Sequence, residues 1–360
     1  MKVLSVVGAR PNFMKVAPVV EALRAKGHDA LLLHTGQHYD AKMSEVFFEQ
    51  LRMPRPDVGL NVGSGSHAQQ TARIMERFEP VVLEHKPDVV LVAGDVNSTV
   101  ACALVAVKLG IKVAHLEAGL RSRDRAMPEE INRVVVDSIS DLLLTPSPDG
   151  DENLKAEGVP DDKIALVGNA MIDTLLAHRD AAPTERVLQE HGLQPGGYGL
   201  LTLHRPSNVD DKDVLTGILG ALEEVATEMP LFFPVHPRTK KQLASFGLSL
   251  PKGVIAAEPL GYLEFLALMA SAKLVMTDSG GIQEETTALG VPCLTLRENT
   301  ERPITIEEGT NTLVGTSPEA IVREAKKAIN GEGKAGRVPD KWDGQTAGRV
   351  VDALETLVAQ

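Results

Sequence analysis

Short aliphatic runs alternate with amphipathic helical patterns along this chain, and the series occurs twice. The first series predicts strands at residues 2–7, 30–34, 88–93, 111–116 and 141–145, with helices at 16–26, 66–85, 97–109 and 130–140. The second predicts strands at 199–203, 231–235, 253–256, 273–277 and 292–295, with helices at 211–228, 238–245, 261–271, 282–289 and 317–329. Strands that alternate with helices form parallel sheets covered by helices. The sequence therefore predicts an α/β protein made of two Rossmann-like domains.

A linker is expected between the two series. Residues 150–198 are charged and rich in Gly and Pro, and they end in Gln-Pro-Gly-Gly-Tyr. A last amphipathic pattern at about 344–358 has no strand after it, so we expect a helix that returns to the first domain. We assign residues 1–170 plus 344–360 to the N-terminal domain and 171–343 to the C-terminal domain.

Composition limits the partners of the chain. A length of 360 residues with 43% hydrophobic residues is enough for two cores. The net charge of −12 and the aromatic content of 3% argue against a nucleic-acid binder. The apolar stretch at the start is too short for a signal peptide, and no run reaches membrane-spanning length. Cys102 and Cys293 are predicted to be reduced core thiols. We expect a cytoplasmic protein without a membrane or nucleic-acid partner.

Residues 274–290 combine an apolar strand, a Ser-Gly-Gly turn and a helix that Gly290 can end. The start of a helix offers unpaired N–H groups, Gly280 and Gly281 allow close approach of an anion, and Ser279 adds a hydroxyl. Glu284 and Glu285 in the first turn of the predicted helix would repel a bare phosphate, so at least one of them is expected to face the hydroxyls of a ribose or sugar. A capped strand-turn-helix joint is the alternative without a ligand. The pattern favours a nucleotide sugar as ligand.

Polar groups follow the predicted strands, where open parallel sheets bind their ligands. These corners are Gly8 to Asn12, Thr35 to His38, Gly94-Asp95, Glu117 to Arg121, His204-Arg205, His236 to Arg238 and Asp278 to Gly281. Seven such corners facing one gap would define an active cleft.

Three acids are candidates for proton transfer. Asp95 and Glu117 each follow a buried strand, where desolvation can raise a carboxyl pKa toward neutrality. Asp95 could instead cap the next helix. The third acid is Glu129 or Glu130, in a first helical turn that Pro128 can open. The polar segment between Arg121 and Met127 is expected to be a mobile loop that carries it.

Cations for a diphosphate are expected from both halves. Arg10 in the first turn and Lys15 in the following helix lie near a positive helix end, although solvated surface positions are the alternative. His204, Arg205, His236 and Arg302 follow strands of the second half. The first turn lacks Gly-x-Gly-x-x-Gly, which disfavours a nicotinamide cofactor. The histidines form no zinc motif, so neither a metal nor a cofactor is expected. His115 is interpreted as part of the scaffold.

The motifs together resemble those of the bacterial non-hydrolysing UDP-N-acetylglucosamine 2-epimerases over nearly the whole chain. They are Gly8-x-Arg10-Pro11, Thr35-Gly-Gln-His38, Gly94-Asp95, Glu117-Ala-Gly-Leu-Arg121, Pro128-Glu-Glu-x-Asn-Arg133, Thr277-Asp-Ser-Gly-Gly-Ile-Gln-Glu-Glu285 and Thr300-Glu-Arg-Pro303. The resemblance implies the glycosyltransferase B-type fold with a terminal helix crossing back, usually as a homodimer. It also implies cofactor-free interconversion of UDP-N-acetylglucosamine and UDP-N-acetylmannosamine for polysaccharide synthesis.

The resemblance also implies roles for single residues. Asp95, Glu117 and Glu129 would be the acid-base groups, and Arg10, Lys15 and His204 would stabilise the departing diphosphate. Ser279 and Gly280 would bind phosphate, Glu285 the ribose, and His236 and Arg302 the nucleotide or its diphosphate.

Some residues depart from the family pattern. Asn12 stands where many members have an acid, the loop before Pro128 is shorter than in some relatives, and Pro206-Ser207-Asn208 alters the setting of His204. The choice of Glu129 over Glu130 stays open. The arginines at 121, 123 and 125 could bind a uronate, which would suit a 2-epimerase of UDP-diacetamido-glucuronic acid, or pair with Asp124 and Asp137. A hydrolysing epimerase, a glycosyltransferase and a non-enzymatic sensor are further alternatives.

Overall fold

The computed structural model describes residues 1–37, 51 and 53–360. It divides into two compact units, Met1–Ala177 with Asp340–Gln360 (unit 1) and His178–Pro339 (unit 2). The domain boundaries placed from the sequence, 170/171 and 343/344, stay a prediction, because compact units need not coincide with domains that fold independently.

The described part of unit 1 contains a fully parallel seven-stranded sheet in the order β3-β2-β1-β4-β5-β6-β7. Its strand β4 is aliphatic throughout, β6 is aliphatic except for Thr145, and both are buried along their whole length, as expected for a sheet covered on both faces. All five strands predicted for the first series are present, whereas β3 and β7 were not predicted. The strands are β1 (Lys2–Val7), β2 (Asp29–His34), β3 (Val58–Gly59), β4 (Val89–Ala93), β5 (Lys112–Leu116), β6 (Leu142–Thr145) and β7 (Ile164–Leu166).

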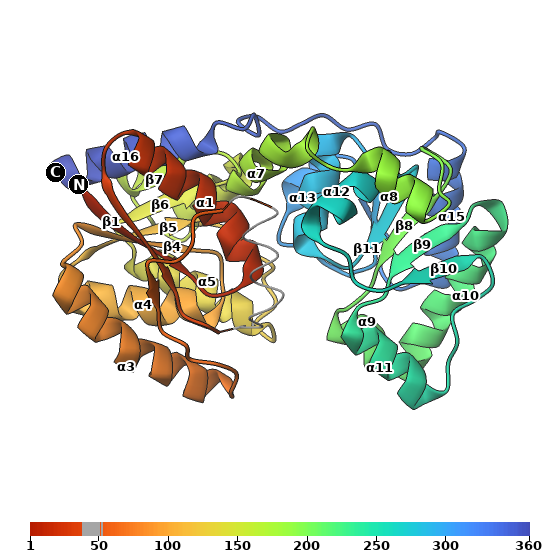
Figure 1. Ribbon diagram of the computed structural model, residues 1–360, viewed down its shortest axis with the longest axis horizontal. Helices are drawn as coiled ribbons and strands as arrows, with labels where there is room; N and C mark the ends of the chain where they lie inside the picture. The colour runs from red at the N-terminus through yellow and green to blue at the C-terminus, as the bar shows by residue number, and fades with distance from the viewer. Residues whose placement is uncertain (38–50, 52) are drawn as a thin grey trace. The chain divides into compact units, whose positions relative to one another are not determined.

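Helices cover both faces of this sheet, with α1 and α16 on one face and α3, α4 and α5 on the other (Figure 1). The helices are α1 (Arg10–Ala25), α3 (His67–His85), α4 (Asn97–Lys108), α5 (Pro128–Ile139), α6 (Pro148–Ala156), the 3-10 helix η1 (Asp161–Lys163), α7 (Ala170–Arg179) and α16 (Thr346–Ala359).

Helix α1 begins at Arg10, so the predicted start at 16 was too late and Arg10 is the first helical residue instead of part of the turn. Asn12 explains the early start. Its Oδ1 accepts a 3.0 Å hydrogen bond from Ala9 N, which satisfies an N–H group before the first turn, and Pro11 suits the start of a helix.

Unit 2 has the same architecture, with a parallel sheet in the order β10-β9-β8-β11-β12-β13. Helices α10 and α15 pack together on one face, and α8, α12 and α13 cover the other (Figure 1). The strands are β8 (Gly199–Thr202), β9 (Leu231–Pro234), β10 (Val254–Ala257), β11 (Leu274–Thr277), β12 (Cys293–Thr295) and β13 (Asn311–Leu313). The helices are α8 (Thr184–Glu190), α9 (Pro206–Val209), α10 (Lys212–Glu228), α11 (Pro237–Phe246), α12 (Tyr262–Ser271), α13 (Gly280–Leu289), α14 (Pro303–Glu307) and α15 (Pro318–Ile329).

Each sheet reverses its strand order once, between β1 and β4 in unit 1 and between β8 and β11 in unit 2. Such a switch point separates the helices that follow its two strands, which leaves a crevice at the carboxyl ends. Gly8 and Asp95 follow β1 and β4, and His204 and Ser279 follow β8 and β11. Each unit therefore brings predicted site residues to its own switch point.

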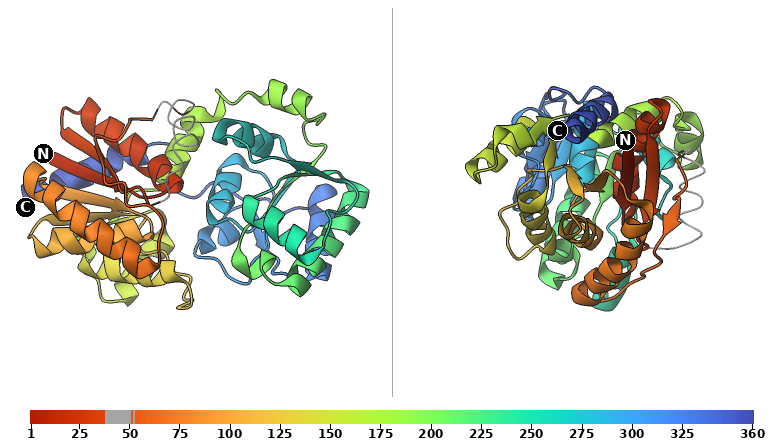
Figure 2. Two further views of the ribbon diagram at one scale, coloured as in Figure 1. Left: turned by 60° about the horizontal axis from the view of Figure 1, so that its bottom comes forward. Right: turned by 90° about the vertical axis from the view of Figure 1, so that its left-hand side faces the viewer.

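The predicted return of the last helix to the first domain is confirmed. In the right-hand view of Figure 2 the dark blue α16 lies beside the red α1. Asp173 on α7 accepts hydrogen bonds from Thr346 N and Ala347 N at the start of α16, and Lys112 Nζ donates to Leu357 O near its end. Trp342, just before this helix, is buried and donates to Pro146 O.

Candidate functional site

Asp95 and Glu117 leave the sheet of unit 1 side by side. Their strands are neighbours, and Ala93 of β4 is paired in register with Leu116 of β5. Gly94 between strand and acid has φ +66°, and a Cβ on it would lie 3.2 Å from Asn12 Nδ2 and 3.4 Å from Glu117 Oε2. Only glycine fits this left-handed position without strain. Glycine at position 94 therefore lets the side chains of Asn12 and Glu117 lie close to the backbone that precedes Asp95.

Glu117 is held in an unusual way. Its φ of +72° is rare for a residue other than glycine, and such outliers cluster at functional sites. Its carboxylate forms a buried ion pair with Lys15, which α1 contributes from about a turn and a half inside the helix. The structure thus joins a predicted acid to a predicted diphosphate cation.

Asp95 is held by two residues of α5. Arg133 directs Nη2 and Nε at Asp95 Oδ2, at 2.7 Å and 3.0 Å. Asn132 Nδ2 donates to the backbone oxygen of Asp95 at 2.8 Å. Both the backbone and the carboxylate of Asp95 are therefore fixed, while its side chain keeps 28% of its surface exposed.

The two glutamates that start α5 differ in their surroundings. Glu130 is buried, and its carboxylate accepts hydrogen bonds from Ser122 N, Ser122 Oγ and Arg123 N and pairs with Arg133. Burial alone would raise the pKa of Glu130, but these hydrogen bonds and the charge of Arg133 lower it below its usual value. Glu130 therefore holds Ser122 and Arg123, at the start of the segment between Arg121 and Met127.

Glu129 faces a polar cavity instead. The cavity has a volume of about 320 Å³, and Asp95 shares its wall with Glu129. Most of the remaining side chains are amides and hydroxyls, which suit a ligand with many hydrogen-bonding groups and little charge. The lining residues are Gln37, Ser64, Gly65, His67, Gln70, Asp95, Val96, Asn97, Pro128, Glu129 and Asn132.

A buried charge network lies behind the acids. His115 Nδ1 lies 2.6 Å from Asp137 Oδ1, and His115 Nε2 lies 2.8 Å from the carbonyl oxygen of Gly94. Asp137 Oδ2 pairs with Arg121 Nη1 at 2.7 Å, and Arg121 also binds Glu157 through two nitrogens. Arg121 is thus a structural cation, which removes it from the arginines considered for a uronate.

Two predicted positions cannot be placed. The side chain of Arg10 and the whole of His38 lie outside the described residues. Gln37 is described, and its Oε1 accepts hydrogen bonds from Ser98 N and Oγ at the start of α4.

In unit 2, Ser279 is the N-cap of α13 and makes no side-chain capping bond, so the helix start is not closed by its own serine. Gly280 and Gly281 open the helix. A Cβ on Gly280 would lie 2.7 Å from Arg302 Nη1 and 2.8 Å from Glu301 Oε1, contacts that real Cβ atoms do not make. A helix N-terminus with an arginine packed against its first glycine is a favourable place for an anion.

Glu284 and Glu285 lie in the second turn of α13, because the helix begins at Gly280 and not at the predicted 282. The expectation that they occupy the first turn was wrong, since the two glycines are themselves helical. Burial raises the pKa of Glu285 to about 7; the hydrogen bond from Tyr262 opposes this shift, and the charge of Glu284 adds to it. Tyr262 Oη donates to Glu285 Oε1 at 2.9 Å.

Arg302 links two acids to the start of α13. It is buried, its Nε lies 3.0 Å from Glu284 Oε1, and its Nη1 pairs with Glu301. These two carboxylates fix the guanidinium beside Gly280.

Asp278 organises the other side of this corner. It is fully buried, and its carboxylate accepts hydrogen bonds from His204 N and Arg205 N and lies 2.8 Å from His204 Nδ1. Asn208 joins Asp278 Oδ2 to the backbone oxygen of Leu296. His204 and Arg205 are therefore held against the strand that leads to Ser279.

His236 completes the predicted set in unit 2. It is the N-cap of α11, and its Nδ1 accepts a hydrogen bond from Arg238 N. Its ring centroid lies 5.5 Å from that of His204. Burial and the nearby charge of His204 lower the pKa of His236.

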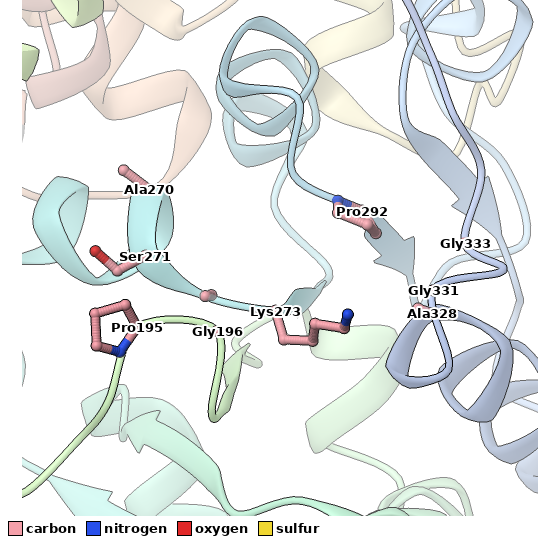
Figure 3. Close-up of a pocket in the computed structure, with 10 residues that line it drawn as sticks. Pro195, Gly196, Ala270, Ser271, Lys273, Pro292, Ala328, Gly331 and Gly333 are labelled. Atoms are coloured by element: carbon pink, nitrogen blue, oxygen red, sulfur yellow. The ribbon is translucent and has the colours of Figure 1, made fainter.

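A larger cavity of unit 2, of about 490 Å³, lies at the opposite end of its sheet (Figure 3). Three of its lining residues, Gly196, Lys273 and Pro292, precede strands β8, β11 and β12. Ligands of open parallel sheets bind at the carboxyl ends. We therefore do not assign this cavity to the site.

Sequence reasoning missed the residues that position others. Arg133, Asn132, Asp278, Asn208 and Tyr262 received no predicted role, although the first four lie in segments that were singled out. Neither a metal-binding group of three His, Cys, Asp or Glu side chains nor a helix with the length and apolarity to cross a bilayer occurs within residues 1–37, 51 and 53–360.

Comparison with known proteins gives one consistent family. The family model described as UDP-N-acetylglucosamine 2-epimerase matches residues 21–355. The chain is 44% identical to the UDP-N-acetylglucosamine 2-epimerase of Methanocaldococcus jannaschii, over 93% of this chain and 97% of that protein. It is 42% identical to the UDP-2,3-diacetamido-2,3-dideoxy-D-glucuronate 2-epimerase of Pseudomonas aeruginosa, over 99% of this chain and all of that one.

A solved structure of the Methanocaldococcus jannaschii enzyme, in complex with UDP-GlcNAc and UDP, matches 99% of this chain and all of that chain with a TM-score of 0.90 and 44% identity. The predicted fold class, two Rossmann-like domains of the glycosyltransferase B type with a returning C-terminal helix, is confirmed.

Proposed function

The chain belongs to the UDP-N-acetylglucosamine 2-epimerase family, and from this premise we propose that it interconverts UDP-N-acetylglucosamine and UDP-N-acetylmannosamine. The reaction inverts C2 of the sugar and needs no net oxidation, hydrolysis or second substrate. The observation that carries the proposal is the pair of acids at the ends of β4 and β5, one of them ion-paired with Lys15.

The proposed mechanism is elimination and re-addition of UDP. The C2 hydrogen has no adjacent carbonyl that could stabilise a carbanion, so its direct removal would be too costly for a single general base. If the base takes the C2 proton while the C1–O bond breaks, the electron pair of the C–H bond forms the C1–C2 double bond. UDP leaves with the electrons of the C–O bond, and 2-acetamidoglucal remains. Protonation of C2 from the other face and attack of UDP on C1 complete the inversion.

We assign proton transfer to Asp95, Glu117 and Glu129. The three acids belong to unit 1, two of them at neighbouring strand ends and the third on the wall that Asp95 also lines. Glu129 is preferred over Glu130, because the carboxylate of Glu130 is engaged by Ser122, Arg123 and Arg133.

We assign UDP to unit 2. Ser279, Gly280 and Gly281 would bind phosphate at the start of α13, with Arg302 beside Gly280 as a fixed cation. Glu285 would accept from the ribose hydroxyls. His204, Arg205 and His236 would line the diphosphate from the β8 side, and Arg10 and Lys15 of unit 1 would stabilise charge on the leaving group.

Solvent exchange at C2 tests the function. In heavy water the protein is expected to convert UDP-N-acetylglucosamine to UDP-N-acetylmannosamine that carries deuterium at C2, because the proton returns from a group that exchanges with solvent. Proton NMR and mass spectrometry of the product measure the label. A product without deuterium would exclude this mechanism. Free N-acetylmannosamine together with UDP would instead identify a hydrolysing epimerase.

The start of α13 gives a binding prediction. Gly280→Ala is expected to raise the Kd for UDP about tenfold, a loss of about 1.4 kcal/mol, because the new methyl group must displace Arg302 or Glu301. Isothermal titration calorimetry with UDP measures this.

Gly220→Ala is the matched control. It lies inside α10, and a Cβ there would meet nothing within 4 Å. Its UDP affinity should equal that of the unmodified protein. An unchanged Kd in Gly280→Ala would remove the start of α13 from the proposed phosphate site.

A second candidate substrate is UDP-2,3-diacetamido-2,3-dideoxy-D-glucuronate, supported by the 42% identity to the Pseudomonas aeruginosa enzyme over the full chain. A uronate needs a cation near C6. Arg125 is exposed in the loop before α5, whereas Arg121 is bound to Asp137 and Glu157. Product analysis with both UDP-sugars distinguishes the two substrates.

We also propose a cytoplasmic homodimer. Both cysteines are free and buried, as suits a reducing compartment. Three neighbouring helices of unit 1 expose large apolar side chains, namely Leu83 on α3, Val107 on α4, and Ile131 and Val134 on α5. Such side chains are typical of an interface when they gather on one face. Analytical ultracentrifugation of the protein and of Ile131→Glu tests the dimer.

A further inference from the structure

Arg133 is a buried cation of unit 1 that is ion-paired with both Asp95 and Glu130. It is 3% exposed, and its guanidinium contacts two acids that belong to different parts of the site. Nη2 and Nε hold Asp95 Oδ2, and Nη1 lies 2.5 Å from Glu130 Oε2. Asp95 stands at the end of β4, whereas Glu130 holds the segment that precedes α5.

The second contact extends to the backbone of this segment. Glu130 Oε2 accepts from Ser122 N at 2.9 Å, and Glu130 Oε1 accepts from Arg123 N at 2.8 Å. Arg123 has φ +59°, which is costly for a residue with a side chain and persists only where the surroundings enforce it. The bond from Arg123 N to a buried carboxylate supplies such a restraint.

Helix α5 makes both connections possible. Glu130 and Arg133 lie three residues apart and so share one face of the helix. Glu129, one residue before Glu130, points from the same turn to the cavity that Asp95 also lines. One turn of α5 therefore carries an acid of the proposed reaction and the arginine that holds another.

We propose that Arg133 is a positioning residue that fixes Asp95 and, through Glu130, makes the orientation of Asp95 depend on the conformation of residues 122–127. This rests on the proposed function. Arginine suits this role because its planar guanidinium directs separate N–H groups at the two carboxylates in fixed directions. Lysine offers one nitrogen at the end of a flexible stem and cannot hold both in the same way.

The first test is Arg133→Lys, which retains the positive charge. Its kcat is expected to fall about 10²-fold, the size of effect that a displacement of about 1 Å of a reacting group produces. The KM for UDP-N-acetylglucosamine and the Kd for UDP should change less than about threefold, since UDP is assigned to unit 2. Hydrogen exchange of the Ser122 and Arg123 amides should accelerate, because Glu130, which accepts hydrogen bonds from both, loses its ion pair with the guanidinium.

Glu130→Gln tests the link to the segment before α5. The amide oxygen of glutamine can still accept from one backbone N–H group, but the attraction to Arg133 is lost. A fall in kcat of about tenfold is expected. In the double variant the two losses should not multiply, because both substitutions break the same connection.

Arg24→Lys is the matched control. Arg24 of α1 also contacts two groups of unit 1, Asp57 and the backbone oxygen of Ala30, but none of the three acids. Its kcat should stay within about twofold of the unmodified protein. A second specific measure is the ratio of C2 deuterium in recovered substrate to that in product, which displacement of one acid alters and general destabilisation does not.

The outcomes separate the two proposals. Labelled product from the unmodified protein together with an unchanged kcat in Arg133→Lys would overturn the inference and leave the function standing. Losses that multiply in the double variant would overturn the connection through Glu130. Unlabelled product from the unmodified protein would overturn the proposed function, and the inference with it.

Discussion

Glu117→Gln is expected to lower the turnover of UDP-N-acetylglucosamine by about 10³-fold or more, while the Kd for UDP stays within about twofold. Glutamine has nearly the same shape but cannot take up a proton, and general acid-base groups typically contribute 10² to 10⁴ in rate. The substitution also removes the buried partner of Lys15, a cation that we assign to the leaving group. Removal of this carboxylate leaves the charge of Lys15 uncompensated, so the expected loss of turnover comes from proton transfer and not from weaker stabilisation of the leaving group.

Steady-state turnover and calorimetric UDP binding measure the two quantities separately. Glu355→Gln serves as control, since Glu355 of α16 is an ion-paired carboxylate of the same unit, bound to His28 and Lys26 on the surface. Full activity in Glu117→Gln would show that Glu117 transfers no proton. A large loss of UDP affinity would show that Glu117 contributes to nucleotide binding, which contradicts its assignment to proton transfer alone.

The sequence predicted the sheet of unit 1 because its central strands are long enough to show a hydrophobic pattern. β1, β4 and β5 have five or six residues, and most of these are aliphatic. β3 has two residues, and β7 and β13 have three each. A segment of two or three residues has no measurable period, so β3, β7 and β13 were not recognised from hydrophobicity, whereas the equally short β12 lies in a longer run that predicted a strand at 292–295.

The predicted starts of two helices were wrong for a different reason. The sequence pattern placed the starts of α1 and α13 at the first regular apolar residues, 16 and 282, but both helices begin earlier. In α1, the first turn has no regular apolar pattern and is stabilised by Asn12, which accepts a hydrogen bond from Ala9 N and donates one to Ala93 O. In α13, two glycines occupy helical positions although glycine disfavours helix. Both helices start at the switch point of a sheet. Functional sites are where residues with a low helix propensity are most often retained in helical positions.

The strand-end corners could be predicted, but the connections between them could not. Asp95 and Arg133 are 38 positions apart, and His204 and Asp278 are 74 apart. Nothing in a single sequence states that these pairs meet. Asp278 is the clearest case, because a carboxylate after a strand suggests a ligand contact, yet this one is fully buried under His204 and Arg205.

The buried network under the acids gives the largest expected effect on stability. Asp137→Asn should lower the free energy of unfolding of unit 1 by about 3–5 kcal/mol, because it leaves Arg121 and His115 buried without their shared carboxylate. Hydrogen exchange of the β5 and β6 amides reports the stability of this unit by itself, which matters because a two-unit chain need not unfold in one step.

The effect should depend on pH in one direction. Burial would raise the pKa of Asp137, but the charges of His115 and Arg121 and their hydrogen bonds outweigh burial and lower it below its usual value. A carboxyl group with a lowered pKa in the folded state stabilises the fold above its unfolded-state pKa and loses this contribution as pH falls through the folded-state value. The difference between protein and variant should therefore shrink as the pH falls below about 4.

Asp141→Asn is the control that distinguishes the loss of a charge in an ion-pair network from the loss of a carboxylate that only accepts a hydrogen bond. Asp141 of the same unit accepts a hydrogen bond from Val113 N, and the structure shows no ion pair for it among the described residues. An asparagine oxygen can replace that acceptor, so the expected cost is at most about 1 kcal/mol. If Asp137→Asn lowered the free energy of unfolding no more than Asp141→Asn does, packing, and not the charges of Asp137, Arg121 and His115, would stabilise the segments around Gly94 and Glu117. The acids of unit 1 would then be positioned independently of Asp137, and Arg121 would have to be considered again as a group available to a ligand.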